Sequence, residues 1–192
     1  GPLQINPWYM EPPAAGYDIV VRLDLGLAFG SGTHPTTALG LEWLDRQDLH
    51  GRRVIDFGCG SGILPIAALK LGAGIALAID NDPQALSATA DNAERNQVGE
   101  RLQLLSVEQG PQAAADVEPA EVLVANILAG PLAALAPDFA RLTRPGGWLA
   151  ISGILAEQAD GLLERYADWF EELRAEKRED WVRISGRRRA DA

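Results

Sequence analysis

The sequence is poor in the residues that cross-link small secreted domains or bind metal ions. Its 192 residues include one cysteine and two histidines. A single cysteine excludes an internal disulfide framework, and so few soft ligands do not supply a zinc site. No apolar run reaches the roughly 20 residues that span a membrane, and no signal peptide opens the chain. We therefore expect a cytoplasmic protein with no metal site and no membrane partner.

Basic residues are also scarce. Lys and Arg total 17 against 27 Asp and Glu, which gives a net charge of −10. This balance argues against broad binding to a phosphate backbone, so we expect no direct nucleic acid binding. It is compatible with a basic protein partner or a cationic cofactor. The chain length suits one domain, and 47% hydrophobic with 23% charged residues is ordinary for a globular protein.

Strand-like and helix-like segments alternate along most of the chain. Alternation of this kind predicts an α/β fold with a parallel sheet and helices on both faces. Two final strand-like runs have no helix between them, so they must pair antiparallel. The expected strands are 19–23, 53–57, 75–80, 102–106, 121–126, 148–152, 170–177 and 181–187, and the expected helices are 35–46, 62–71, 83–96, 131–142 and 156–166.

A glycine-rich turn follows the apolar run at residues 54–57. The run carries Asp56, and glycine then recurs at every second position, starting with Gly58 and Gly60. A strand, a glycine turn and a helix start let backbone N–H groups approach a nucleotide-like ligand. The dinucleotide fingerprint needs a further glycine where this chain has Ile63. The pattern instead resembles the first motif of Rossmann-like S-adenosylmethionine-dependent methyltransferases, and a turn that merely reverses the chain is the alternative.

A second acidic residue supports a nucleoside ligand. Strand-type residues 76–79 end at Asp80, 22 positions after Gly58. An acidic residue at this distance can accept hydrogen bonds from both ribose hydroxyls. Adenosylmethionine keeps both hydroxyls free, so Asp80 suits it as well as NAD. The alternative role is a helix cap, for which Asp82 before Pro83 is better placed.

The segment 26–37 is rich in small residues and leads into a helix that Pro35 opens. A helix N-terminus has unpaired N–H groups and a partial positive charge, which suit a carboxylate such as that of methionine. Thr36 and Thr37 add hydroxyls there. A phosphate-binding loop would need a lysine that this segment lacks. A plain surface loop stays the alternative, and His34 fits a structural or capping role better than that of a base.

Asn126 closes the strand expected at 121–126. Ligands of open parallel sheets bind beyond the carboxyl ends of the strands. An asparagine there can accept a hydrogen bond from an amine and donate one to a cofactor. We predict that Asn126 contacts the cofactor and positions the target amine, with a helix cap as the alternative. The loop resembles the Asn-Pro-Pro-aromatic loop of amino-group methyltransferases but lacks its prolines and aromatic residue.

Several long motifs in order resemble the PrmA family, the bacterial methyltransferases of the eleventh large-subunit ribosomal protein. The resemblance implies a class I methyltransferase fold, with a seven-stranded, mostly parallel sheet and an antiparallel last strand. It implies methyl transfer from S-adenosylmethionine to lysine side chains and the N-terminal α-amine of that ribosomal protein. The matching segments are 27–37, 54–64, 125–131, 151–155 and 181–187. The resemblance implies that the cofactor is bound by Thr37, Gly58, Asp80 and Asn126. We add two further candidate cofactor-binding residues from the glycine motif, Asp56 and Gly60.

The same resemblance bears on domain organisation, because the family has an N-terminal substrate-recognition domain. Residues 1–3 resemble a protease-cleavage scar, and residues 4–17 contain three prolines and read as an extended interdomain linker. We therefore expect 18–192 to be the catalytic domain alone. The alternatives are an RNA or small-molecule methyltransferase of the same fold, and a cofactor-binding domain that is inactive without its recognition domain.

Overall fold

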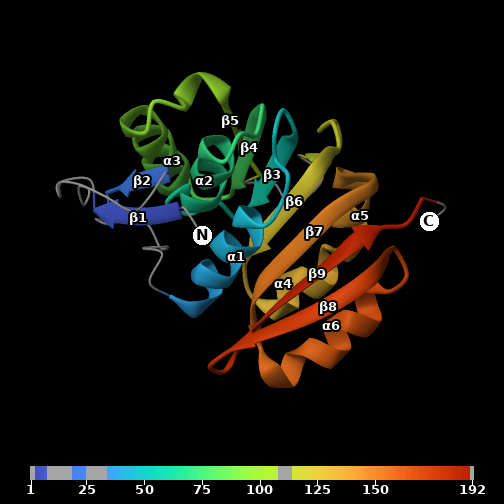
Figure 1. The fold of residues 1–192 in the computed structure, drawn as a ribbon. Helices are drawn as coiled ribbons and strands as arrows, with labels where there is room; N and C mark the ends of the chain where they lie inside the picture. The colour runs from blue at the N-terminus through green and yellow to red at the C-terminus, as the bar shows by residue number, and fades with distance from the viewer. Residues whose placement is uncertain (1–2, 8–18, 25–33, 108–113, 191–192) are drawn as a thin grey trace.

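The computed structural model describes residues 3–7, 19–24, 34–107 and 114–190. A seven-stranded sheet in the order β5-β4-β3-β6-β7-β9-β8 forms its centre (Figure 1). β9 is antiparallel to both of its neighbours, and the other paired strands are parallel. This confirms the predicted sheet and its antiparallel last strand. The strands are β3 (Arg53–Phe57), β4 (Ile75–Asp80), β5 (Leu102–Ser106), β6 (Ala120–Asn126), β7 (Thr143–Leu155), β8 (Phe170–Arg178) and β9 (Trp181–Arg188).

Helices cover both faces of the sheet (Figure 1). Strand β3 shows why, because it is buried on both sides: Val54 packs with the first group of helices, and Ile55 and Phe57 pack with the second. The first group is α1 (Pro35–Asp45), α2 (Ile63–Lys70) and α3 (Pro83–Arg95), and the second is α4 (Ala129–Ala134), α5 (Ala136–Leu142) and α6 (Ala159–Tyr166). None of these described helices is long and apolar enough to cross a membrane.

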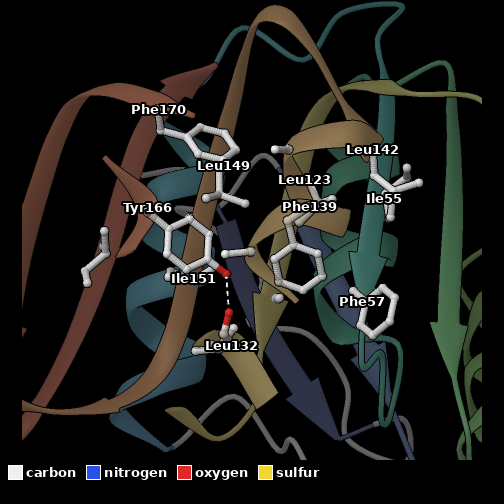
Figure 2. Close-up of a cluster of buried hydrophobic side chains, with 14 of the residues drawn as sticks. Ile55, Phe57, Leu123, Leu132, Phe139, Leu142, Leu149, Ile151, Tyr166 and Phe170 are labelled. Atoms are coloured by element: carbon white, nitrogen blue, oxygen red, sulfur yellow. Dashed lines mark hydrogen bonds between the residues drawn. The ribbon is translucent and has the colours of Figure 1, made fainter. Parts of the chain in front are cut away.

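Aromatic side chains fill the core beneath α4, α5 and α6 (Figure 2). Phe57 at the end of β3 meets Phe139 of α5 edge-on, with 5.2 Å between ring centroids. The Tyr166 hydroxyl donates a hydrogen bond of 2.7 Å to the carbonyl oxygen of Leu132. Burial of a hydroxyl is tolerated because it finds this partner. The bond ties α6 to α4, the helix that follows the end of β6.

The helix predicted over 131–142 is two helices. Pro137 lies in the first turn of α5, where its missing N–H and its ring are tolerated, whereas a continuous helix would place both in the interior. The helix predicted from residue 156 begins with a short 3-10 turn, Ala156–Gln158. Strand β7 is longer than the predicted strand at 148–152, because it also includes residues 143–147, where Gly146 has φ +77°.

The start of the chain also differs from the prediction of an extended linker. Residues Leu3–Pro7 form strand β1, which pairs in parallel with β2 (Ile19–Leu23). Leu3 and Ile5 pack against the core beside α2, because apolar residues at every second position place both on one face of a strand. Residues 8–18 lie outside the described part, so the domain boundary at residue 17 stays a prediction.

Candidate active site at the carboxyl ends of the parallel strands

Three predicted site residues meet at one edge of the sheet. Asp56, Asp80 and Asn126 lie at or next to the last residues of β3, β4 and β6, which are neighbours in the sheet. Two adjoining cavities open there, of about 560 and 260 Å³. Their combined size is in the range of small-molecule sites, roughly 300–1,000 Å³. Both cavities are lined by Gly58, Asp80, Asn81, Asn126 and Ile127.

The two cavities differ in chemistry. The larger one extends toward the second group of helices and is mainly apolar, while the smaller one lies against the first turns of α1 and α2 and holds the more polar groups. The larger is also lined by His34, Thr36, Phe57, Val107, Leu128, Pro131, Leu135, Gly153 and Trp181. The smaller is also lined by Thr37, Asp56, Cys59, Gly60, Ile63 and Leu64.

The glycine turn is braced by hydrogen bonds within the protein. The N–H groups of Gly58 and Cys59 donate to the carbonyl oxygen of Ile79, at 2.7 and 3.1 Å. The Gly60 N–H donates to Asp80 Oδ2 at 3.0 Å. The sequence predicts that these N–H groups face a ligand, but the structure differs, because the Ile79 carbonyl oxygen and the Asp80 carboxylate already accept their hydrogen bonds. Because Gly58 and Gly60 have no side chains, a ligand at these cavities can approach their backbone closely.

Gly58 is required for a second reason. Its φ is +87°, and a Cβ atom added there would lie 2.4 Å from Cγ2 of Ile127. A side chain would therefore collide with Ile127 and adopt a strained backbone conformation. Position 58 therefore requires glycine for two reasons: the close contact with Ile127 in the loop after β6, and the positive φ of the turn.

Asp80 accepts two backbone hydrogen bonds. Its Oδ2 takes the Gly60 N–H, and its Oδ1 takes the Asp82 N–H at 3.0 Å. An ionised carboxylate has about four acceptor sites, so two remain for hydroxyl groups of a ligand. The helix cap of α3 is Asp82, whose side chain accepts from the Gln84 N–H. This confirms that Asp80 is not the cap.

Asp56 is a buried acid at the smaller cavity. Its side chain is 1% exposed, and its Oδ1 atom has no hydrogen-bond partner among the described residues. Burial and, to a smaller extent, the nearby Asp80 carboxylate together raise the pKa of Asp56 to about 8. A buried acceptor without a partner costs free energy, so the site favours a ligand that brings a cationic donor.

The first turn of α1 is already capped. The His34 ring accepts from the Thr36 N–H, and the His34 carbonyl oxygen accepts from the N–H groups of Thr37 and Ala38. Pro35 has no N–H. The sequence predicts that this helix end offers N–H groups to a carboxylate, but these N–H groups donate to His34 instead. This confirms the capping role of His34, and the residues before it, 25–33, lie outside the described part.

Asn126 bridges β6 and α1. Its side-chain amide donates to Thr37 Oγ1 at 3.3 Å. Thr37 is buried, and Asn126 is half-buried at the junction of the two cavities. The structure therefore brings together Thr37 and Asn126, two of the residues predicted from separate motifs.

Sequence reasoning missed the apolar side of the site. Trp181, the first residue of β9, packs edge-on against His34 with 5.0 Å between ring centroids. Leu128, two residues after Asn126, lines the larger cavity and is 72% exposed. The family resemblance includes Trp181 in the segment 181–187 but gives it no role at the site, because only the antiparallel β9 carries it to α1.

No described feature indicates metal or thiol chemistry. In the part of the chain that the structure covers, no three His, Cys, Asp or Glu side chains group closely enough to hold a metal ion. Cys59 is buried in the glycine turn, and burial raises the pKa of its thiol. A high thiol pKa leaves little reactive thiolate, so Cys59 acts as a small residue in the turn.

Comparison with known protein families shows the family of this chain. Residues 2–189 match the model of the family described as ribosomal protein L11 methyltransferase (PrmA). The chain belongs to the PrmA family. Among curated PrmA relatives, the ribosomal protein L11 methyltransferase of Hahella chejuensis is 60% identical over 186 residues, which is 97% of this chain and 62% of that protein. The one from Pectobacterium carotovorum is 60% identical over 170 residues, 88% of this chain and 56% of that protein.

Solved structures show the same fold. The crystal structure of ribosomal protein L11 methylase from Lactobacillus delbrueckii subsp. bulgaricus has a TM-score of 0.87 and 32% identity, covering 98% of this chain and 95% of that one. A SAM-dependent O-methyltransferase from Thermotoga maritima is 14% identical with a TM-score of 0.67, covering 81% and 65%. The second likeness concerns the fold alone. The chain spans about three fifths of the length of the curated PrmA relatives it matches.

Proposed function

We propose that this chain transfers methyl groups from S-adenosylmethionine to amino groups of ribosomal protein L11, on lysine side chains and the N-terminal α-amine. The observation that carries the proposal is the meeting of Thr37, Asp80 and Asn126 around one cleft in a PrmA-family chain. A ribosomal-protein substrate also supports the cytoplasm as the place of action.

The residues present fit this cofactor. Asp80 keeps acceptor sites for two ribose hydroxyls. Asp56 lines the smaller cavity and has a buried Oδ1 atom without a partner among the described residues, so an ammonium group of the ligand would suit this carboxylate. Two acidic side chains also suit a ligand that carries both a sulfonium and an ammonium charge. When bound, adenosylmethionine supplies an activated methyl group on its sulfonium.

The chain's own contribution to transfer is positioning. The attacking amine must be neutral, and a lysine at its reference pKa of about 10.4 costs roughly 4–5 kcal/mol to deprotonate at pH 7, against about 1 kcal/mol for an α-amine near pKa 8. Asn126, with an amide oxygen that can accept from the amine, holds the target at the junction of the cavities. We assign no general base.

We further propose that residues 18–192 form the catalytic domain and that protein-substrate recognition lies in the part of the curated relatives that this chain does not span. A tethered recognition domain raises the local concentration of each target amine at the site. The chain should then bind adenosylmethionine as a longer relative does but methylate ribosomal protein L11 far more slowly.

The test pairs a binding and a transfer measurement. Titration calorimetry with adenosylmethionine, with its demethylated product and with NAD should show binding of the first two only. Mass spectrometry should then show added methyl groups on purified ribosomal protein L11, with the full-length Hahella chejuensis relative as the comparison. NAD binding without adenosylmethionine binding overturns the cofactor assignment. Methylation of RNA in place of the protein overturns the substrate, and equal turnover of the two proteins overturns the separate recognition domain.

A further inference from the structure

Strand β7 has a bulge beside the site, at Ser152 and Gly153. On one side of the bulge Ile151 lies opposite Ile184, and on the other Ile154 lies opposite Val182, so β7 takes three steps where β9 takes two. A bulge of this kind inserts one extra residue and redirects the strand. The bulge lies directly next to the end of β6, because Ser152 pairs with Asn126.

Gly153 allows the loop after β6 to lie against β7. Its φ is +90°, and a Cβ atom there would be 2.2 Å from the carbonyl oxygen of Ile127 and 3.3 Å from Oδ1 of Asn126. The Ile127 N–H donates to the Ser152 carbonyl oxygen at 3.2 Å. A side chain at 153 would push the Ile127 backbone away, and Asn126 is the residue before it.

Ser152 connects the same bulge to α1. Its hydroxyl donates to the carbonyl oxygen of Thr36 at 3.0 Å, and its side chain is 3% exposed. Thr36 precedes Thr37, whose hydroxyl accepts from Asn126. These contacts form a closed ring. Ser152 bonds to Thr36 in the first turn of α1, and Thr37 in the same turn accepts from Asn126. Ile127, the residue after Asn126, donates back to the Ser152 carbonyl oxygen.

We infer that Ser152 and Gly153 are positioning residues, which fix Asn126 and Thr37 relative to each other before a ligand arrives. Ser152 is not among the residues that line the two cavities, so it acts through its neighbours. Removing one link should leave the fold intact and misplace the site, because a ring of buried hydrogen bonds aligns its members together. The inference uses adenosylmethionine as the ligand and in that respect depends on the proposed function.

The chain has matched controls for both positions. Ser185 is a buried serine on β9 that lines neither cavity. Gly146 is also on β7 with a positive φ of +77°, but a Cβ atom there meets nothing closer than Nη2 of Arg187 at 3.7 Å. Ser185→Ala therefore reproduces the loss of a buried hydroxyl, and Gly146→Ala the backbone strain, without touching the ring.

The first measurement is adenosylmethionine affinity by calorimetry for the two variants and their controls, with thermal unfolding to verify that each folds. Ser152→Ala and Gly153→Ala should each weaken binding about fivefold or more, as expected for a lost or displaced buried hydrogen bond, with the controls within about twofold. Unchanged affinity in a folded Ser152→Ala protein overturns the inference. If Gly153→Ala does not fold but Gly146→Ala does, the affinity of Ser152→Ala alone tests the inference.

The second measurement separates positioning from general support. The affinity losses of Ser152→Ala and Thr37→Val should be less than additive in the double variant, because both break the same ring. Additive losses would count against the inference. The side-chain amide resonance of Asn126 in ligand-free protein should also shift in Ser152→Ala and not in Ser185→Ala. This last readout holds even if the wild-type chain binds no adenosylmethionine, in which case the proposed function fails and the resonance decides the inference.

Discussion

The side-chain amide of Asn126 donates a hydrogen bond to the hydroxyl of Thr37, which lies 89 positions earlier in the chain. The bond joins the end of β6 to the first turn of α1 at the smaller cavity, which both residues line. It places in contact two groups that the sequence offered as separate candidates for cofactor binding. The geometry of the site therefore depends on how α1 packs at the ends of the strands.

Replacing Thr37 by valine should weaken adenosylmethionine binding about three- to tenfold. The change keeps the shape of the side chain but removes the acceptor, and a typical hydrogen bond contributes about 0.5–1.5 kcal/mol. Calorimetry measures the affinity. Thr143→Val is the control, since Thr143 is equally buried and donates to the Phe139 carbonyl oxygen away from the cavities. Equal affinities for wild type and Thr37→Val would count against a role for Thr37.

Asp80→Ala should reduce adenosylmethionine affinity at least tenfold, about 1.4 kcal/mol. The variant removes both the ribose acceptors and the acceptor that braces the Gly60 N–H. The control, Asp82→Ala, removes the α3 cap and should cost about 1 kcal/mol of stability while leaving affinity unchanged. A folded Asp80→Ala protein with wild-type affinity would make Asp80 purely structural.

Gly58→Val should abolish most ligand binding, because the new side chain meets Ile127 and displaces the loop that directly follows Asn126. Gly51→Val is the matched control: Gly51 has φ +69°, but nothing lies within 4 Å of its added Cβ atom. Both variants carry a backbone strain of about 1–3 kcal/mol. Thermal unfolding and calorimetry should show lost affinity for Gly58→Val alone, and similar affinities in the two variants would refute the assignment.

Asp56 should make the ligand-free protein less stable as the pH rises. Its pKa is about 8 in the folded protein against 3.8 ordinarily. Between these values the folded state holds a proton that the unfolded chain has released, so the free energy of unfolding falls by at most about 1.4 kcal/mol per pH unit. The stabilisation is complete below pH 3.8 and lost as the pH passes 8. Thermal unfolding of Asp56→Asn should lack this contribution, and identical pH profiles would contradict it.

The same carboxyl group should couple ligand binding to pH. An ammonium group beside Asp56 favours the ionised form, so binding should release a proton below pH 8. The affinity of wild type relative to Asp56→Asn should then rise between pH 6 and 8, and this ratio cancels the ligand's own titration. Calorimetry in two buffers of different ionisation enthalpy measures the proton. No proton release would place the ligand's cation elsewhere.

The class of fold and the edge of the sheet where the site lies can be predicted from the amino-acid pattern alone. Alternating segments predict parallel strands, and parallel strands bring Asp56, Asp80 and Asn126 to one edge whatever fills the loops between them. Gly58 and Gly60 match the dinucleotide-binding fingerprint, but Ile63 stands where that fingerprint has a further glycine. This difference distinguishes the motif from that of a dinucleotide-binding fold. These are local patterns, readable from neighbours along the chain.

The contacts that support the site depend on tertiary packing and could not be predicted from the sequence. They are the hydrogen bond from the Gly60 N–H to Asp80, the capping of α1 by His34, and the bond between Ser152 and Thr36, which are 116 positions apart. The contact of Trp181 with His34 depends on an antiparallel strand inserted between two parallel ones. Periodicity and spacing fix where a strand ends, but hydrogen-bond partners between loops are chosen by three-dimensional proximity, which no local pattern encodes.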